Sequence, residues 1–248
     1  MKDTRVLMGM PITVEIVDSK ANIKNIDKVF DYFKYVDKKF STYIKGSEIT
    51  KINKGLIDIK NASDDMKKIL DLCESTKKET NGYFDISHNG KLDSSGLVKG
   101  WAINNAANLI SKMGFKNFFV DAGGDIQVKG KNKENEVWKI GIQNPFNLKE
   151  IIKVIWLKGE GVSTSGTYIR GQHVYDPYYP RSLLQDIVSL SVIGPNVYEA
   201  DRFATAAFAM GQKGISFIEN LSGFEGYMID RMGTATYTSG FDKYVLKT

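Results

Sequence analysis

The sequence predicts an α+β fold in which helices pack on largely antiparallel sheets. Two observations carry this prediction. Strand-like and helix-like segments follow one another irregularly, without the regular strand–helix–strand order that builds a parallel sheet. Several apolar strand segments are also joined by short turns, as in antiparallel hairpins. At 248 residues and 42% hydrophobic content, the chain is long enough to fold as a single domain spanning residues 1–248.

The first third of the chain is expected to contain one strand and two long helices. Apolar and polar residues alternate over residues 5–17, which predicts a half-buried strand. An apolar stripe at helical spacing predicts an amphipathic helix over residues 25–40. Ser63 is a favourable N-cap for a second helix, which should run to about Thr80 and end at Asn81-Gly82.

Residues 92–125 form the most informative stretch. Apolar residues recur at steps of three to four over residues 98–113, which predicts a helix, and Gly114 stands where a left-handed C-cap would end it. Residues 118–120 have strand character. The strand is expected to end in a turn at residues 121–125, because glycine and aspartate tolerate unusual backbone angles.

The next segments predict a run of strands. Residues 126–128, 137–143 and 151–157 are expected to be consecutive strands, and residues 187–193 another. Residues 161–166 are small and polar, which predicts a flexible segment.

A late helix is expected over residues 199–211, because a glycine follows its last apolar residues. Two strands, over residues 226–230 and 236–241, should then close the fold.

Composition excludes several classes of protein. The formal net charge is +5, but the lysines are spread along the chain, which favours a solvated basic surface over a nucleic-acid partner. The chain lacks the roughly 18 consecutive apolar residues of a membrane-spanning helix, so no membrane insertion is expected. The N-terminus does not resemble a secretory signal, which predicts a cytoplasmic protein, or an exported one from which a signal segment has been removed. Cys73 is the single cysteine, which fits a reducing compartment.

Two short patterns suggest anion binding. Asp93 and residues 94–96 precede the middle helix, and Lys99 lies in its first turns. Unpaired N–H groups at a helix N-terminus suit phosphate, and a lysine adds a full positive charge. Gly123 and Gly124 would allow the backbone to approach a ligand closely. A capped helix followed by a tight turn, with no ligand, explains the same residues equally well.

Metal and acid–base chemistry rest on fewer residues. Asp201 and Thr205 are four residues apart, so they share a helical face, and their oxygens suit a hard cation such as Mg²⁺. This spacing is common and does not by itself indicate a site. The hydroxyls of residues 163–165 would serve phosphate or simply a turn. His173, one of only two histidines, would suit phosphoryl-transfer chemistry or an ordinary hydrogen bond.

Five motifs occur in a specific order: DSSGLVKGWAI at residues 93–103, DAGGD at 121–125, STSGTYIR at 163–170, HVYDP at 173–177 and EADRFATAAFAMG at 199–211. Together they resemble the ApbE family, and the resemblance extends over nearly the whole chain. It implies a T-fold-like architecture and a flavin transferase, which uses FAD to attach FMN covalently to a Thr or Ser of an acceptor flavoprotein, with release of AMP. Hydrolysis of FAD to FMN and AMP, or FAD binding without catalysis, stays open at this point.

The resemblance also implies a site. Mg²⁺ would be held by Asp201, Thr205 and the main-chain carbonyl of Gly96. The expected catalytic residues are His173, Lys99 and Asp201, with His173 first for acid–base work. The residues expected to contact FAD are Met8, Ser41, Tyr43, Tyr83, Phe84, Asp85, Asp93, Lys99, Gly123, Gly124, Asp125, Thr164, Ser165, Gly166, His173 and Val174.

The chain departs from the family pattern at two places. Only five residues separate Ser87 from Asp93, where many members carry a longer insert, so the chain resembles a compact subtype. Asp176-Pro177 is followed by two tyrosines instead of the usual Arg-Thr-Gly, so the shape of the loop over residues 177–186 is not predicted.

Overall fold

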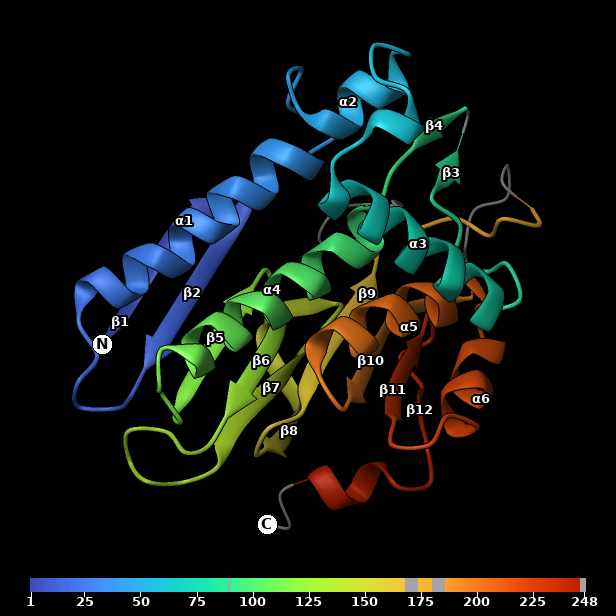
Figure 1. The fold of residues 1–248 in the computed structure, drawn as a ribbon. Coiled ribbons are helices and arrows are strands. Elements are labelled where there is room, and N and C mark those ends of the chain that lie inside the picture. Colours follow the sequence, from blue (N-terminus) through green and yellow to red (C-terminus); the bar gives the residue numbers. More distant parts are fainter. Residues whose placement is uncertain (89, 168–173, 180–185, 246–248) are drawn as a thin grey trace.

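The computed structural model describes residues 1–88, 90–167, 174–179 and 186–245. Within these residues, eight strands form one sheet in the order β1-β2-β5-β6-β9-β10-β11-β12, and each neighbouring pair is antiparallel. Helices pack on this sheet (Figure 1), so the predicted α+β class is confirmed. The strands of the sheet are β1 (Lys2–Leu7), β2 (Met10–Ile16), β5 (Phe118–Ala122), β6 (Asp125–Lys129), β9 (Gly161–Gly166), β10 (Ile187–Gly194), β11 (Glu225–Asp230) and β12 (Ala235–Tyr237).

The helices follow the predicted apolar periodicities with boundaries shifted by a few residues. Three of the long helices begin at a side-chain cap: Asn22, Ser63 and Asn196 accept main-chain N–H groups of their own helices. Ser94, at the start of α4, forms no such hydrogen bond. The short helix α6 was not predicted. The helices are α1 (Ile23–Phe40), α2 (Glu48–Asn53), α3 (Asp64–Glu79), α4 (Ser95–Lys112), α5 (Val197–Ala209) and α6 (Lys213–Glu219), with short 3-10 turns at Ile59–Asn61 and Phe241–Tyr244.

The predicted strand over residues 5–17 is in fact a hairpin. Met8 and Gly9 both adopt positive φ, of 53° and 74°, and form the turn between β1 and β2. The alternation misled because Met8 in the turn and Met10 in β2 are both apolar, so the pattern continues through the turn. Within β2 the prediction is confirmed, since its alternate side chains are buried.

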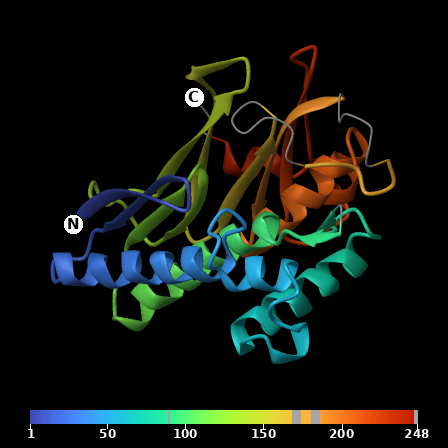
Figure 2. The same ribbon diagram turned by 90° about the horizontal axis from the view of Figure 1, so that it is seen from above.

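Helices α1, α4 and α5 cover one face of the sheet (Figures 1 and 2). α4 lies between α1 and α5 and is therefore buried on most of its sides, beyond the single apolar stripe that periodicity predicts. At Gly100, an added Cβ would lie 2.5 Å from Asp201 Cβ and 2.8 Å from the carbonyl oxygen of Val197. The glycine is therefore what allows α4 and α5 to cross in near-backbone contact.

The opposite face of the sheet is covered by a separate two-stranded ribbon of β7 (Trp138–Asn144) and β8 (Asn147–Leu157). Both strands were predicted, but as successors of β6 within one run; in the sheet, β6 pairs with β9 instead. The ribbon buries alternate apolar residues against the sheet, which is why it leaves the sheet's plane and forms its own layer. These buried residues are Trp138, Ile140, Ile142, Ile155 and Leu157.

Residues 161–166 are the main correction to the predicted elements. They form a central, mostly buried strand, β9, where the sequence suggested a flexible segment. Their small side chains serve packing: a Cβ on Gly161 would overlap the main chain of Val197 at the start of α5. The strand predicted at residues 236–241 is also shorter, since β12 gives way to a 3-10 turn at Phe241.

Two short strands precede α4 in the chain. β3 (Ser87–His88) and β4 (Lys91–Leu92) pair as a short hairpin ahead of that helix. Among the helices described here, none is long and apolar enough to cross a membrane.

Candidate functional site

The crossing of α4 and α5 brings together a lysine and two buried acids. Lys99 Nζ lies 2.5 Å from Asp125 Oδ2 and 3.9 Å from Asp201 Oδ1. Asp125 comes from the start of β6 and is 1% exposed, and Asp201 is 2% exposed. Buried charges are costly unless they are paired, so this lysine compensates one acid closely and the other only in part.

Asp201 is held by hydrogen bonds from two other elements. Its Oδ2 accepts the main-chain N–H of Gly100 at 2.7 Å, and its Oδ1 accepts the Ser163 hydroxyl of β9 at 3.2 Å. Burial raises the pKa of the Asp201 carboxyl well above its usual range, and although Lys99 lowers it, the negative charge of Asp125 raises it further. A cation at these oxygens would favour the ionised carboxylate.

Two neutral oxygens lie beside Asp201. The Thr205 hydroxyl, one turn along α5, donates to the main-chain carbonyl of Gly96 at 3.2 Å. Oxygens bound to one Mg²⁺ at about 2.1 Å in octahedral geometry are about 3 Å apart, close to this separation. Ser94 adds a fully buried hydroxyl that has no hydrogen-bond partner among the described residues. The Thr205 hydroxyl and the Gly96 carbonyl therefore have a spacing that suits Mg²⁺, and the Asp201 carboxylate, one turn away on α5, is a ligand type that Mg²⁺ prefers.

This donor set differs from a carboxylate-rich metal site. Over the residues that the structure describes, no group of three or more His, Cys, Asp or Glu side chains is placed to hold a metal. Mg²⁺ commonly takes one or two carboxylates and completes its shell with water and substrate phosphate. An ion on Asp201, Thr205 and Gly96 would keep much of its charge available for such a phosphate.

Strand β9 holds the Asp125 carboxylate at the oxygen that does not contact Lys99. The main-chain N–H of Thr164 donates to Asp125 Oδ1 at 3.2 Å. The Thr164 hydroxyl shares a 2.7 Å hydrogen bond with the hydroxyl of Ser191 in β10, and Ser165 is buried. Gly166 pairs with Ser189 at the end of the strand. The hydroxyls expected to serve phosphate thus lie in the sheet, next to Asp125.

The predicted glycine turn joins β5 to β6. Gly123 and Gly124 have φ of 62° and 94°, and the N–H of Gly124 donates to Asp121 Oδ1 at 2.8 Å. The turn lies against the β1–β2 hairpin that contains Met8, because a Cβ on Gly123 would lie 3.0 Å from the sulfur of Met10. Burial raises the pKa of Asp121, and Asp125 adds to the rise. Asp121 was not predicted as a site residue, although the DAGGD motif contains it.

The segment Tyr83–Asp85 approaches the same region from the end of α3. Phe84 is buried, and its ring lies 3.5 Å from the position that a Cβ on Gly96 would take. Tyr83 packs edge-on against Tyr178, with ring centroids 5.1 Å apart. Asp85 pairs with Lys77 Nζ at 2.7 Å.

The remaining expected residues come from separate segments of the chain. Ser41 caps α1, and Tyr43 beside it is 94% exposed, with its N–H on the Ser41 hydroxyl at 3.4 Å. Asp93 accepts the N–H of Ser95 at 3.0 Å, at the start of α4. Val174 is buried in the core cluster formed around α5. His173 lies outside the described residues.

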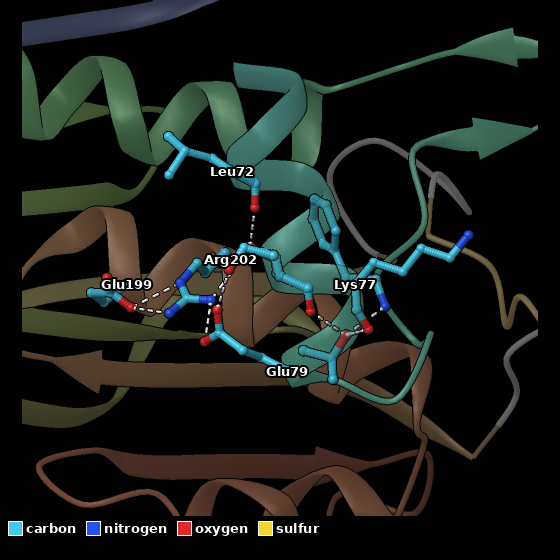
Figure 3. Close-up of polar contacts among 9 residues, drawn as sticks. Leu72, Lys77, Glu79, Glu199 and Arg202 are labelled. Carbon is cyan, nitrogen blue, oxygen red and sulfur yellow. Dashed lines mark hydrogen bonds and ion pairs between the residues drawn. The ribbon is translucent and has the colours of Figure 1, made fainter. Parts of the chain in front are cut away.

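Sequence reasoning missed one buried charge next to Asp201. Arg202 is 7% exposed and contacts Glu199 of its own helix and Glu79 of α3 (Figure 3). Burial lowers the pKa of this guanidinium, but the two glutamates raise it to a net value above the ordinary one, so Arg202 stays charged. The signal that could have revealed it is an arginine within the apolar run of the late helix.

Comparison with known proteins points to one family. A model of the ApbE family matches residues 8–90 and 87–228. The FAD:protein FMN transferase of Escherichia coli (strain K12) is 30% identical over 156 residues, which cover 59% of this chain and 44% of that protein. The corresponding protein of Haemophilus influenzae is 28% identical over 169 residues, covering 63% and 49%. The matched regions thus span about half the length of these curated relatives.

Solved structures establish the fold. The flavin transferase ApbE from Vibrio cholerae superposes with a TM-score of 0.86 at 19% identity, covering 99% of both chains. The ApbE protein from Thermotoga maritima superposes with a TM-score of 0.87 at 20% identity, covering 100% of this chain and 99% of that one. The family model covers most of the chain. Three of the ordered motifs that it spans, at residues 93–103, 121–125 and 199–211, supply Lys99, Asp125 and Asp201. The chain therefore belongs to the ApbE family.

Proposed function

We propose that this protein is a Mg²⁺-dependent FAD:protein FMN transferase, which moves FMN from FAD to a Thr or Ser of an acceptor flavoprotein. The observation that carries the proposal is the meeting of Lys99 and Gly96 on α4 with Asp201 and Thr205 on α5. This arrangement offers a cation site and a lysine at the N-terminal end of a long helix, which suits a diphosphate. The curated relatives in this family bear the name of this activity.

Asp201, Thr205 and the Gly96 carbonyl would hold Mg²⁺. When bound, the ion would neutralise charge that develops on the phosphate oxygens. Lys99 would bind a phosphate oxygen, and Asp125 would orient the Lys99 ammonium through their 2.5 Å contact. Ser163 and the N–H of Gly100 would keep Asp201 in one orientation.

In the proposed reaction, the acceptor's hydroxyl oxygen bonds to the phosphorus of the FMN half of FAD. The bond from that phosphorus to the bridging oxygen breaks, and AMP leaves with this oxygen. The hydroxyl proton passes to a base, for which His173 is the proposed residue. Lys99 would stabilise the charge on the leaving phosphate.

The rest of FAD is proposed to lie along segments that meet near the start of α4. Tyr83 and Phe84 offer aromatic surface to a ring, and Asp85 and Asp93 offer hydrogen-bond acceptors. The other proposed FAD contacts are Met8, Ser41, Tyr43, Gly123, Gly124, Asp125, Thr164, Ser165, Gly166, His173 and Val174.

The test is incubation of the purified chain with FAD, Mg²⁺ and a flavoprotein domain that carries a candidate Thr or Ser acceptor. Mass spectrometry should detect one covalent FMN on the acceptor, and chromatography should detect an equal amount of AMP. Asp201→Ala should abolish the adduct, whereas Asp71→Ala, at an exposed position of α3, should leave it unchanged. Free FMN and AMP without an adduct would identify an FAD pyrophosphatase instead. FAD binding without AMP release would identify a non-catalytic flavin-binding protein.

A further inference from the structure

Arg202 carries a buried guanidinium that bridges two helices. Its Nε donates to Glu199 Oε2 at 2.8 Å, and its Nη2 lies 2.6 Å from the same oxygen. Its Nη1 donates to Glu79 Oε2 at 2.8 Å and to the Thr76 hydroxyl at 3.3 Å. Figure 3 shows Arg202 between Glu199, three residues before it on α5, and Glu79, on the last turn of α3.

The end of α3 also holds the segment that follows it. Thr80, which caps α3, accepts the N–H of Phe84 through its hydroxyl at 3.1 Å. Lys77, on the last turn, pairs with Asp85 at 2.7 Å, and the N–H of Gly82 donates to the Lys77 carbonyl at 2.7 Å. These three contacts mean that the chain from Gly82 to Asp85 moves with the end of α3.

The two sets of contacts form one connection. Arg202 directly follows Asp201, so its backbone shares a turn of α5 with the proposed metal ligands. A guanidinium is planar and holds carboxylates in fixed directions, so it sets both the distance and the orientation of α3 relative to α5. Thr76 strengthens the link, since its hydroxyl also donates to the Leu72 carbonyl at 2.8 Å and is thereby fixed on α3.

We propose that Arg202 is a positioning residue that aligns the FAD-contacting segment Gly82–Asp85 with Asp201 and Thr205, by tying α3 to α5 through Glu79. The proposal rests on the proposed function, because that function assigns FAD to this segment and Mg²⁺ to α5. Arg202 itself touches neither ligand in this scheme. The alternative is a purely stabilising ion pair, which would affect unfolding and leave FAD affinity unchanged.

The two glutamates provide matched variants. Glu79→Ala removes the ion pair between the helices and leaves only the 3.3 Å contact of Arg202 with the Thr76 hydroxyl. Glu199→Ala removes a carboxylate from the same guanidinium within one helix. Both substitutions place alanine, a good helix former, on a helix, and each leaves Arg202 with one glutamate. Comparing them separates the link between helices from the loss of a charge partner.

Two measurements read the effect. Hydrogen exchange of the amides of residues 82–86, in the ligand-free protein, should be about tenfold faster in Glu79→Ala and within about twofold of wild type in Glu199→Ala. The dissociation constant for FAD, from flavin fluorescence in the presence of Mg²⁺, should rise by about tenfold in Glu79→Ala, at the low end of the effect of a residue that orients ligating groups. Turnover at saturating FAD should change much less, because the reacting groups stay in place.

Each other outcome overturns the proposal. Unchanged exchange in Glu79→Ala would show that Arg202 does not place the segment. Faster exchange with unchanged FAD affinity would show that the placement has no role in binding, and equal losses in both variants would assign the effect to charge alone. Neither measurement depends on FMN transfer, because exchange is measured without ligand and FAD binding is measured without turnover. A wild-type protein that binds FAD but transfers no FMN would therefore refute the proposed function, while the role of Arg202 could still be tested.

Discussion

Substitution of Gly100 by alanine tests the crossing on which the site depends. The new Cβ would lie 2.5 Å from Asp201 Cβ and 2.8 Å from the Val197 carbonyl oxygen. Carbon atoms in contact are about 3.5–4.0 Å apart, so α4 and α5 must separate by about 1 Å. Overpacking of this kind costs about 1–3 kcal/mol, while alanine in place of glycine inside a helix contributes about 1 kcal/mol in the other direction. We expect a net loss of up to about 2 kcal/mol of unfolding free energy.

The functional effect should exceed the loss of stability. Gly96 and Lys99 belong to α4, and Asp201 and Thr205 belong to α5, so separating the helices spreads the proposed metal ligands and moves Lys99 away from Asp201. A displacement of about 1 Å of groups that position a substrate can reduce the rate by about 100-fold. Urea denaturation followed by circular dichroism measures the first effect, and release of AMP from FAD with Mg²⁺ present measures the second.

Gly46→Ala is the control, because among the described residues nothing lies within 4 Å of a Cβ added there and Gly46 does not adopt positive φ. This variant should match wild type in both measurements. If Gly100→Ala were as stable and as active as Gly46→Ala, α4 and α5 would not be in near-backbone contact, and the proposed site would be wrong.

Three further predictions concern single groups. Asp125→Asn keeps an acceptor for the Thr164 N–H but removes the carboxylate that lies 2.5 Å from Lys99 Nζ. Because this breaks a buried ion pair, the free energy of unfolding, measured by urea denaturation, should fall by about 3 kcal/mol. Thr80→Val leaves the buried N–H of Phe84 without its acceptor and should cost about 1–3 kcal/mol, whereas Thr80→Ser should restore most of it. Burial raises the pKa of the Cys73 thiol to about 12, so the thiol stays protonated at pH 8. Iodoacetamide should therefore label Cys73 only in denaturant, with mass spectrometry as the measurement. If the native protein were labelled as fast as the denatured protein, the buried face of α3 would be wrongly assigned.

The local part of the fold was predictable from the sequence. The amphipathic helix over residues 25–40 and the capped helix after Ser63 depend on spacing and capping within the helix itself, and both were confirmed. The errors arose where distant segments decide the structure. Residues 161–166 have the composition of a loop, but their small size is required because α5 crosses β9. The separate β7–β8 ribbon likewise depends on which face of the sheet lacks helices.

The candidate site divides in the same way. Periodicity placed Asp201 and Thr205 on one helical face, and they lie one turn apart on α5. Their approach to Gly96 and Lys99 depends on Gly100, whose role appears only once α4 and α5 are packed together. Arg202 escaped prediction because its partners, Glu79 and Thr76, are more than 120 residues away in the sequence. A charged residue within an apolar helical run indicates a buried ion pair, but it does not indicate which distant residues form that pair.

The charges at the crossing lead to a final prediction about the order of binding. Lys99 is already paired with Asp125, and Asp201 adds a negative charge when it ionises, so the ligand-free site offers no net positive charge to a diphosphate. A divalent cation on Asp201 reverses this balance. We therefore expect FAD to bind at least about tenfold more weakly in EDTA than in Mg²⁺, with flavin fluorescence as the measurement. In Asp201→Asn, which lacks the carboxylate charge but keeps its shape, Mg²⁺ should no longer strengthen binding. Equal FAD affinity with and without Mg²⁺ in the wild-type protein would mean that Lys99 and the α4 N-terminus hold the diphosphate by themselves, and that the oxygens of Asp201, Thr205 and Gly96 serve the packing of α4 on α5.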